Sequence, residues 1–418
     1  MMRQQWCHGV SLSLLLVYAM TMFVSRSDAL LAVRTKTTPV ESSPEIHFLE
    51  PRDDGVRLSY RVWKAKGGVK TPSSLPVLLI HPVGIGQGAW YWDQLCQALQ
   101  RKEKESRSQR VCYALNLLGC GLQDGGDAWN DAVTRNKKND KKNQPYALNR
   151  ILSLWIQDCQ ALLQQRILSA AASAAGKQTR SQPLATSFSF DSLWPSAFPW
   201  KKSNSQRCHV VVQGGLAPLG LLLAARCPDQ VASLVLTSPP PSFQEATTPL
   251  PLREIDQNLQ FLTSRPFGDW ALTNLERKWA IEVFSNLFLF HQPCDATWIQ
   301  KCLHEARPEA RPPVQAFNAG ELQRPEAWHE LLPGGMSGDT SAIIRELIQQ
   351  PVLIVQGQAD TKQRKEARLD YIRVLPDCRM ETLPGKSVVP WESPDETVQA
   401  LLSFWQTVEN QKQQPSRG

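Results

Sequence analysis

The chain has 418 residues, of which 42% are hydrophobic and 20% are charged, and this balance is typical of a globular protein rather than a disordered one. The length provides material for one large α/β domain or two ordinary domains. The 46 basic and 39 acidic residues leave a net charge of +7, which is too small to indicate a nucleic-acid-binding protein.

The first 29 residues have the pattern of a secretory signal peptide. Arg3 precedes the apolar run Val10–Val24, which is shorter than the roughly 20 residues that a membrane-spanning helix needs. Ala29 ends a small-residue cleavage site. We therefore predict that residues 1–29 are removed and leave no integral membrane anchor, the alternative being an uncleaved anchor.

Residues 30–45 are basic, rich in hydroxyl side chains and poor in acids, which is the composition of a transit peptide. A signal peptide followed by such a segment resembles the bipartite presequences of algae with secondary plastids. The chain also has no N-x-S/T acceptor and no C-terminal K-D-E-L. A plastid location is predicted, and secretion or the endomembrane lumen is the alternative.

Apolar runs alternate with amphipathic segments from residue 46 onward. The predicted strands are Val56–Tyr60, Pro76–Ile80, Val111–Leu117, His209–Val212, Val231–Leu236 and Pro351–Val355. The predicted helices are Ala89–Leu99, Leu148–Leu168, Leu216–Arg226 and Pro394–Val408. Strands that alternate with helices indicate an α/β fold, with a mostly parallel central sheet flanked by helices.

Several stretches do not fit this core, which we assign to residues 46–240 and 341–408. Polar composition predicts surface insertions at 101–110, 124–144 and 169–206, and a disordered tail at 409–418. Residues 241–340 are rich in Trp, Phe and Leu and contain helical segments, including Ala271–Phe290 and Asp295–Ala306. They are predicted to form a helical cap over the carboxyl ends of the strands, where ligands bind in open α/β sheets.

Five sequence motifs follow one another along the predicted α/β core. They are P-V-L-L-I-H-P-V-G from Pro76, N-L-L-G-C-G from Asn116, V-V-V-Q-G-G-L-A-P from Val210, P-V-L-I-V-Q-G-Q-A-D from Pro351 and L-P-G-K-S-V-V-P-W-E-S-P from Leu383. Together they resemble the α/β-hydrolase superfamily, from about Val56 to Phe404. The V-Q-G-G-L and P-W-E segments are also similar to uncharacterised plastid and cyanobacterial members of that superfamily with a degenerate catalytic triad.

The resemblance assigns the parts of a catalytic site to numbered positions. His81 and Pro82 match the H-G turn that shapes the oxyanion hole, and Gly215, which follows the nucleophile position, belongs to the same region. Asn116 replaces the aspartate of D-x-x-G-x-G. Asp360 has the spacing of the acid that orients the catalytic histidine.

The other two triad positions hold residues that cannot perform the chemistry. The strand-to-helix turn, written G-x-S-x-G in the family, has Gly214 at the nucleophile position, where glycine adopts the required positive φ without strain but cannot attack a substrate. The histidine should precede Pro394 by about seven residues, where Ser387 lies, or Val388 if one residue is deleted. No histidine follows His329, so Ser-His-Asp hydrolysis is not expected.

Substitutes for the missing groups are not apparent. Ser238 and Cys120 lie at predicted strand ends, but neither has a base beside it in the sequence. No Cys or His pair has metal-ligand spacing, and no cofactor motif is present, so neither a metal nor a cofactor is predicted.

Three functions are compatible with an α/β-hydrolase-like fold. The first is a non-hydrolytic protein whose capped pocket binds an apolar small molecule or whose surface binds a protein partner. The second is an enzyme of another type, esterase-like, lyase or isomerase, that uses Asp360 and backbone oxyanion donors at the same pocket. The third, an ordinary hydrolase, requires a serine at the turn and a histidine near Pro394, and both are missing.

Overall fold

The computed structural model describes residues 43–52, 55–64, 74–106, 110–121, 129, 148–169, 207–264, 266–332 and 338–411. The predicted signal peptide, most of the transit-like segment and nearly all of the insertions 124–144 and 169–206 lie outside these residues. Within the described residues, no helix is long and apolar enough to cross a membrane.

An eight-stranded sheet forms the centre of the molecule, in the order β1-β2-β4-β3-β5-β6-β7-β8. The strands are β1 (Glu45–Phe48), β2 (Ser59–Trp63), β3 (Val77–Ile80), β4 (Cys112–Leu115), β5 (Cys208–Gln213), β6 (Val231–Thr237), β7 (Val352–Gly357) and β8 (Cys378–Leu383). β1 pairs antiparallel with β2 and β2 pairs antiparallel with β4, whereas all pairs from β4 to β8 in this order are parallel. This confirms the predicted α/β class.

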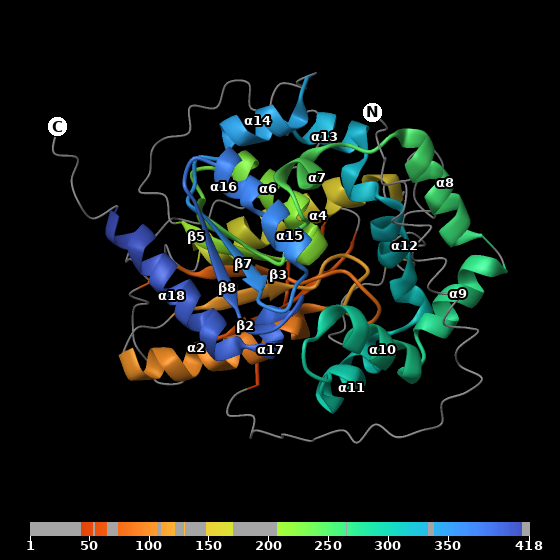
Figure 1. Ribbon diagram of the computed structural model, residues 1–418, viewed down its shortest axis with the longest axis horizontal. Helices are drawn as coiled ribbons and strands as arrows, with labels where there is room; N and C mark the ends of the chain where they lie inside the picture. The colour runs from red at the N-terminus through yellow and green to blue at the C-terminus, as the bar shows by residue number, and fades with distance from the viewer. Residues whose placement is uncertain are drawn as a thin grey trace.

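Helices cover both faces of the sheet (Figure 1). One face is covered by η2 (Ala89–Trp92), α2 (Asp93–Ser106), α17 (Val389–Glu392) and α18 (Pro394–Gln411). The other is covered by α4 (Ile151–Leu162), α6 (Ala217–Arg226), α7 (Phe243–Thr247), α14 (Thr340–Leu347) and α16 (Leu369–Val374), with η4 (Leu148–Arg150), η5 (Leu163–Leu168) and α15 (Lys362–Ala367) beside them. The mostly apolar sequences of the central strands follow from this double burial.

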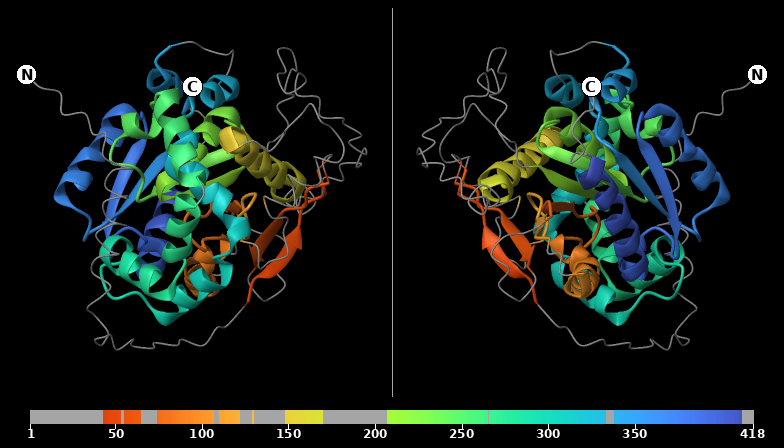
Figure 2. Two further views of the ribbon diagram at one scale, coloured as in Figure 1. Left: turned by 90° about the vertical axis from the view of Figure 1, so that its right-hand side faces the viewer. Right: turned by 90° about the vertical axis from the view of Figure 1, so that its left-hand side faces the viewer.

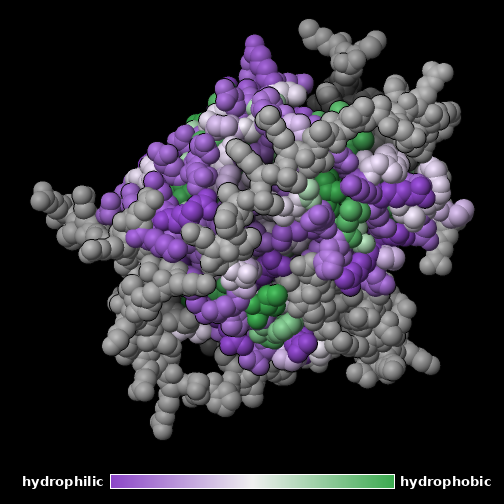
Figure 3. Space-filling model, turned by 90° about the horizontal axis from the view of Figure 1, so that it is seen from below, coloured by the Kyte–Doolittle hydropathy of each residue, from purple (hydrophilic) through white to green (hydrophobic). Residues whose placement is uncertain are grey.

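Most of the chain between β6 and β7, from α8 to α13, forms the cap, whose helices face the viewer in the left view of Figure 2. After α7 it contains α8 (Leu252–Thr263), α9 (Phe267–Leu275), α10 (Lys278–Phe284), η8 (Ser285–Leu289), α11 (Ala296–Glu305), η9 (Pro308–Ala310), α12 (Arg311–Ala319), η10 (Glu321–Gln323) and α13 (Pro325–Leu331). The single helix predicted at Ala271–Phe290 is therefore three elements. On the face seen in Figure 3, the described residues are mainly hydrophilic, with hydrophobic residues in separate patches.

Two polar stretches are ordered where the sequence predicted irregular chain. α2 continues to Ser106, so much of the predicted insertion 101–110 is helical, and the predicted tail at 409–418 begins inside α18. Glu103 and Arg110 are buried against each other, with Arg110 Nη1 donating to Glu103 Oε1 at 3.1 Å, and Arg110 Nη2 also donates to Glu409 at 2.9 Å. Two of the charges in 101–110, Glu103 and Arg110, are thus neutralised inside the fold, whereas Arg101, Lys102 and Lys104 are exposed.

Candidate functional site at the strand ends

The turn between β5 and α6 has the shape expected of a nucleophile elbow. Gly214 has φ +63° and begins the short turn η7 (Gly214–Leu216), which leads directly into α6. A Cβ atom placed on Gly214 would meet no heavy atom of the described residues within 4 Å, apart from its chain neighbours. The turn therefore faces open space and presents no side chain to it.

Gln213, the last residue of β5, joins this turn to two neighbouring segments. Its Oε1 accepts a hydrogen bond from Thr237 Oγ1 at 2.5 Å, at the end of β6. Its Nε2 donates to the backbone carbonyl of Ser387 at 2.8 Å, in the loop after β8. The motif alignment is consistent with this contact, because it places Ser387 close to Gly214. Sequence reasoning missed Gln213, since Ser387 lies 174 residues away in the chain.

The loop at Ser387 is attached to the cap by hydrogen bonds to three successive carbonyl groups of η8. Lys386 Nζ donates to Leu287 O at 2.5 Å, Ser387 Oγ donates to Phe288 O at 3.1 Å, and Ser387 N donates to Leu289 O at 2.9 Å. The Ser387 hydroxyl therefore serves as a donor to the backbone. This position anchors the loop to the cap.

Glu392 strengthens the same attachment. Its Oε2 accepts from the backbone N–H of Lys386 at 2.7 Å, and its Oε1 accepts from the N–H groups of His291 and Gln292 at 2.7 and 3.3 Å. A carboxylate that accepts several backbone N–H groups forms charge-assisted hydrogen bonds, which are stronger than neutral ones. The cap and the loop after β8 are consequently held as one unit.

Asp360 follows β7, as its motif predicts, and its carboxylate is buried. Its Oδ2 accepts from Arg368 Nη1 at 2.6 Å, and its Oδ1 accepts from the N–H of Thr361 at 2.9 Å. Arg368 Nε in turn donates to the carbonyl of Pro239, just after β6, at 3.0 Å. Asp360 therefore orients an arginine that fixes the turn after β6.

The residues that the motifs align with the oxyanion hole also make contacts that hold the fold together. His81 is fully buried; its Nε2 accepts from the N–H of Leu117 at 3.3 Å, so the ring is neutral and its Nδ1 donates to Pro82 O at 2.7 Å. Pro82 has no N–H to offer an oxyanion. A Cβ on Gly215 would lie 2.5 Å from Cζ of Phe317, in α12, so the cap rests on this residue.

The cap packs onto the strand-end loops at three glycines. Besides Gly215, a Cβ on Gly86 would overlap the backbone carbonyl of Cys302 in α11, and one on Gly119 would lie 2.5 Å from Pro313 Cγ in α12. These loops follow β3, β4 and β5. Helices α11 and α12 therefore contact the loops at the carboxyl ends of the strands. The close approach of these helices to the loops is possible because glycine has no side chain.

Ser238 and Cys120 do not supply a replacement nucleophile. Ser238 is buried, has φ +47° and has a hydroxyl with no hydrogen-bond partner among the described residues, so no base activates it there. Burial raises the pKa of the Cys120 thiol to about 12, which keeps it protonated near neutral pH.

Asn116, which replaces the aspartate of the family motif, connects three segments of the chain. Its Oδ1 accepts from the N–H of Ala89 at 2.7 Å, and its Nδ2 donates to the Ser59 hydroxyl at 2.9 Å.

Metal ligation finds no support in the part of the chain that the structure describes. No group of three or more His, Cys, Asp or Glu side chains is placed to hold an ion there. The cysteines of the described residues are all unpaired, and eight of these nine are buried.

A Ser-His-Glu array lies at the amino ends of β5 and β6, at the opposite end of the strands from the elbow. His209, at the start of β5, has Nδ1 2.8 Å from Ser233 Oγ and Nε2 3.1 Å from Glu409 Oε1. Its ring stacks on Trp405 of α18 with centroids 5.0 Å apart. Ser233 and His209 have no exposed surface, so no substrate can reach them. The array fastens the end of α18 to the sheet.

Glu409 makes this array sensitive to acid. Burial alone would raise the pKa of Glu409, but the hydrogen bond from His209 and the charge of Arg110 together bring the pKa below its usual value of 4.5. Since the folded pKa is the lower one, the stabilisation is present above pH 4.5 and is lost as pH falls through the folded pKa. We expect Glu409→Gln to lower the free energy of unfolding by about 1–3 kcal/mol at pH 7.

The difference between wild type and Glu409→Gln should shrink below pH 4.5, as measured by urea unfolding at several pH values. Glu45→Gln is the matched control, because the pKa of Glu45 is also lowered, chiefly by its hydrogen bond with Lys64, but this pair is exposed. We expect the control to change stability by less than about 1 kcal/mol. A constant Glu409→Gln deficit from pH 7 to pH 3 would contradict the assignment.

Solved structures share this architecture. A haloalkane dehalogenase loop variant from Bradyrhizobium elkanii superimposes with a TM-score of 0.52 and 13% identity, covering 89% of this chain and 100% of its own. A serine hydrolase involved in carbazole degradation gives 0.48 and 17%, covering 87% and 100%. The first likeness and the strand order define an α/β-hydrolase fold. No protein-family model and no curated protein matches the chain.

Proposed function

We propose that this chain is a non-hydrolytic α/β-hydrolase-fold protein that binds a small apolar molecule in the space between the elbow and the cap. The observation that carries the proposal is the elbow itself, because Gly214 keeps the positive φ of the turn and faces open space. A turn kept without a nucleophile favours binding over hydrolysis.

The surrounding groups support this reading. Ser387 donates to the cap backbone, Asp360 holds Arg368, and His81 uses both ring nitrogens in backbone contacts. Ser387, Asp360 and His81 are therefore each engaged in contacts that hold the fold together. The alternative, an enzyme of another type at the same pocket, would need Asp360 as its acid or base, and both of its oxygens already accept hydrogen bonds.

The test is binding of a neutral apolar dye, N-phenyl-1-naphthylamine, followed by its fluorescence. We expect the wild type to bind it and Gly214→Leu to weaken binding at least tenfold, because the leucine side chain would fill the open space. Gly55→Leu is the matched control, since Gly55 also has positive φ (+75°) and an open Cβ position but lies in the turn before β2. Equal binding by both variants, or no binding by the wild type, would refute the proposal.

A further inference from the structure

The cap presents a run of apolar side chains to solvent on α10 and η8. Of the eight large hydrophobic residues that are exposed in the described part of the chain, three lie within 283–287. These are Val283, Phe284 and Leu287, with 38%, 45% and 54% of their surface exposed. The ring of Phe284 also packs on that of Phe288, with centroids 4.9 Å apart. Residues three and four apart share one side of a helix, so the four side chains form a continuous apolar stripe.

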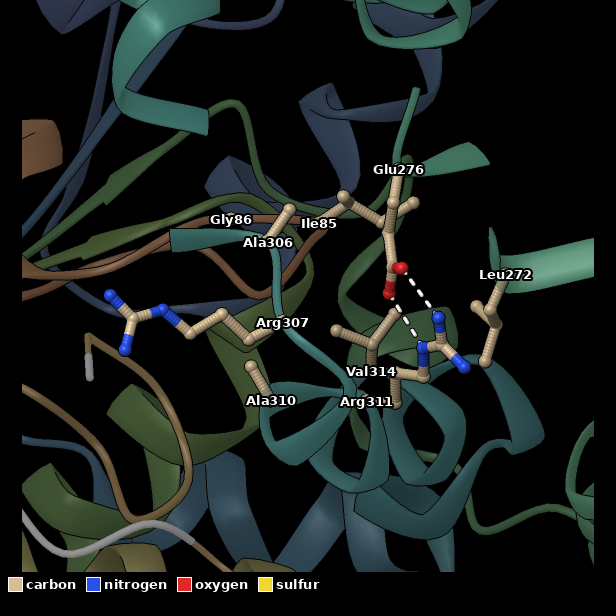
Figure 4. A pocket seen from close by; sticks show the side chains of 9 residues that line it. All are labelled: Ile85, Gly86, Leu272, Glu276, Ala306, Arg307, Ala310, Arg311 and Val314. Atoms are coloured by element: carbon tan, nitrogen blue, oxygen red, sulfur yellow. Dashed lines mark hydrogen bonds and ion pairs between the residues drawn. The ribbon is translucent and has the colours of Figure 1, made fainter. Parts of the chain in front are cut away.

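Both ends of this stripe are fixed to the rest of the molecule. Just before α10, Glu276 accepts two hydrogen bonds from Arg311 of α12, at 2.7 Å from Nε and 2.6 Å from Nη2 (Figure 4). Such a two-pronged ion pair is strong and geometrically specific. At the other end, the carbonyl group of Leu287 accepts from Lys386 Nζ in the loop after β8. The stripe is therefore held on the outside of the cap by contacts on either side of it.

Basic residues lie at both ends of the stripe. Arg277 and Lys278 are exposed at the start of α10. Lys386 lies beside the other end, because its Nζ donates to the carbonyl of Leu287. The segment 277–289 contains one acidic residue, Glu282. The stripe with its flanking bases thus carries an excess of positive charge, which is complementary to a negatively charged surface.

The exposed area distinguishes between two kinds of partner. Three half-exposed side chains of this size offer roughly 200–300 Å², well below the about 800 Å² that each partner buries in a stable protein interface. A second copy of the chain would need contacts that the stripe does not provide. A lipid bilayer needs fewer contacts, because a few apolar side chains enter the boundary between headgroups and acyl chains while nearby bases bind anionic headgroups.

We propose that the stripe on α10 and η8 is a peripheral membrane-binding surface that places the cap on an anionic lipid bilayer. Phe284 and Leu287 enter the boundary between headgroups and acyl chains, and the bases at the two ends of the stripe bind lipid phosphate groups. The helix lies flat on the bilayer, since its apolar residues lie between the two groups of bases. This inference goes beyond the proposed function and does not depend on it.

The experiment measures flotation of residues 30–418 with phosphatidylcholine vesicles that contain or lack phosphatidylglycerol. This form contains every described residue and omits the predicted signal peptide, whose apolar run would itself bind vesicles. We expect the wild type to bind the anionic vesicles at least fivefold more tightly than the neutral ones. Phe284→Ser/Leu287→Ser should weaken binding to the anionic vesicles at least tenfold, because it removes the side chains that enter the bilayer.

Leu369→Ser/Ile372→Ser is the matched control. Each of these two side chains is 40% exposed, but they belong to α16, which covers the sheet and is not part of the cap. The control should bind the anionic vesicles as the wild type does. All of these side chains are exposed, so near-UV circular dichroism of both double variants should match that of the wild type.

The outcomes decide the proposal. Vesicle binding that is lost in Phe284→Ser/Leu287→Ser and kept in the α16 control supports it. No flotation of the wild type, or equal flotation of the wild type and Phe284→Ser/Leu287→Ser, would overturn it. Dimerisation of the wild type in light scattering that disappears in Phe284→Ser/Leu287→Ser would also overturn it, because the stripe would then bind a second copy of the chain. Equal binding to neutral and anionic vesicles would overturn the role given to the bases.

Discussion

Arg368→Met is expected to lower the free energy of unfolding by about 3–5 kcal/mol, because it leaves the buried Asp360 carboxylate without its counter-ion. Arg368 and Asp360 each have side-chain exposures of 2%, and their atoms are 2.6 Å apart. The variant also removes the hydrogen bond that Arg368 gives to Pro239. Urea unfolding at pH 7 measures the loss.

Arg364→Met is the control for this prediction. Arg364 also lies near Asp360, but at 4.0 Å and with more than half of its side chain exposed. Exposed pairs contribute about 0–1 kcal/mol, so the control should unfold almost like the wild type. A loss of less than about 1 kcal/mol in Arg368→Met would mean that Arg368 does not neutralise Asp360. The carboxylate would then be available for chemistry at the site.

Gly86→Ala should also be severely destabilising. Its Cβ would overlap the backbone carbonyl of Cys302, and φ is +66°, a conformation that alanine adopts with difficulty. Overpacking costs about 1–3 kcal/mol and the left-handed conformation about 1–2 kcal/mol, so we expect a total of about 2–5 kcal/mol. Thermal or urea unfolding of the purified variant provides the value.

Gly214→Ala isolates the backbone contribution. Gly214 has nearly the same φ, +63°, but an alanine there would contact nothing within 4 Å in the described residues, so only the conformational cost of about 1–2 kcal/mol applies. Equal losses in the two variants would show that α11 does not press on the loop after β3. The close contact between Cys302 of the cap and Gly86 would then be absent.

The central strands were predictable because they are buried on both faces. β5, β6 and β7 are mostly apolar in sequence, and the predicted segments His209–Val212, Val231–Leu236 and Pro351–Val355 overlap most of each strand. β8 reads C-R-M-E-T-L and β1 reads E-I-H-F; these are the edge strands, and half-exposed strands carry polar residues. Neither was predicted, for that reason.

The candidate site was predictable in its positions but not in its contacts. Motif spacing placed Gly214 at a sharp turn, Asp360 directly after the strand that is now β7, and Ser387 about seven residues before Pro394. Ser387, which accepts the hydrogen bond of Gln213 Nε2, and the cap residues over the glycines lie more than 100 residues away in the chain. Only the folded arrangement of cap and sheet brings them together. The presequence stays a prediction, since residues 1–42 lie outside the described chain.

Labelling with a fluorophosphonate probe, which reacts with activated serines, tests the central claim most directly. We expect no labelling of the native protein at pH 7–8 under conditions that fully label an active serine hydrolase, since no serine side chain lies at the elbow and Ser387 donates to the cap backbone. Stoichiometric labelling, mapped by mass spectrometry to Ser238 or Ser387, would contradict it and identify an active nucleophile on this scaffold.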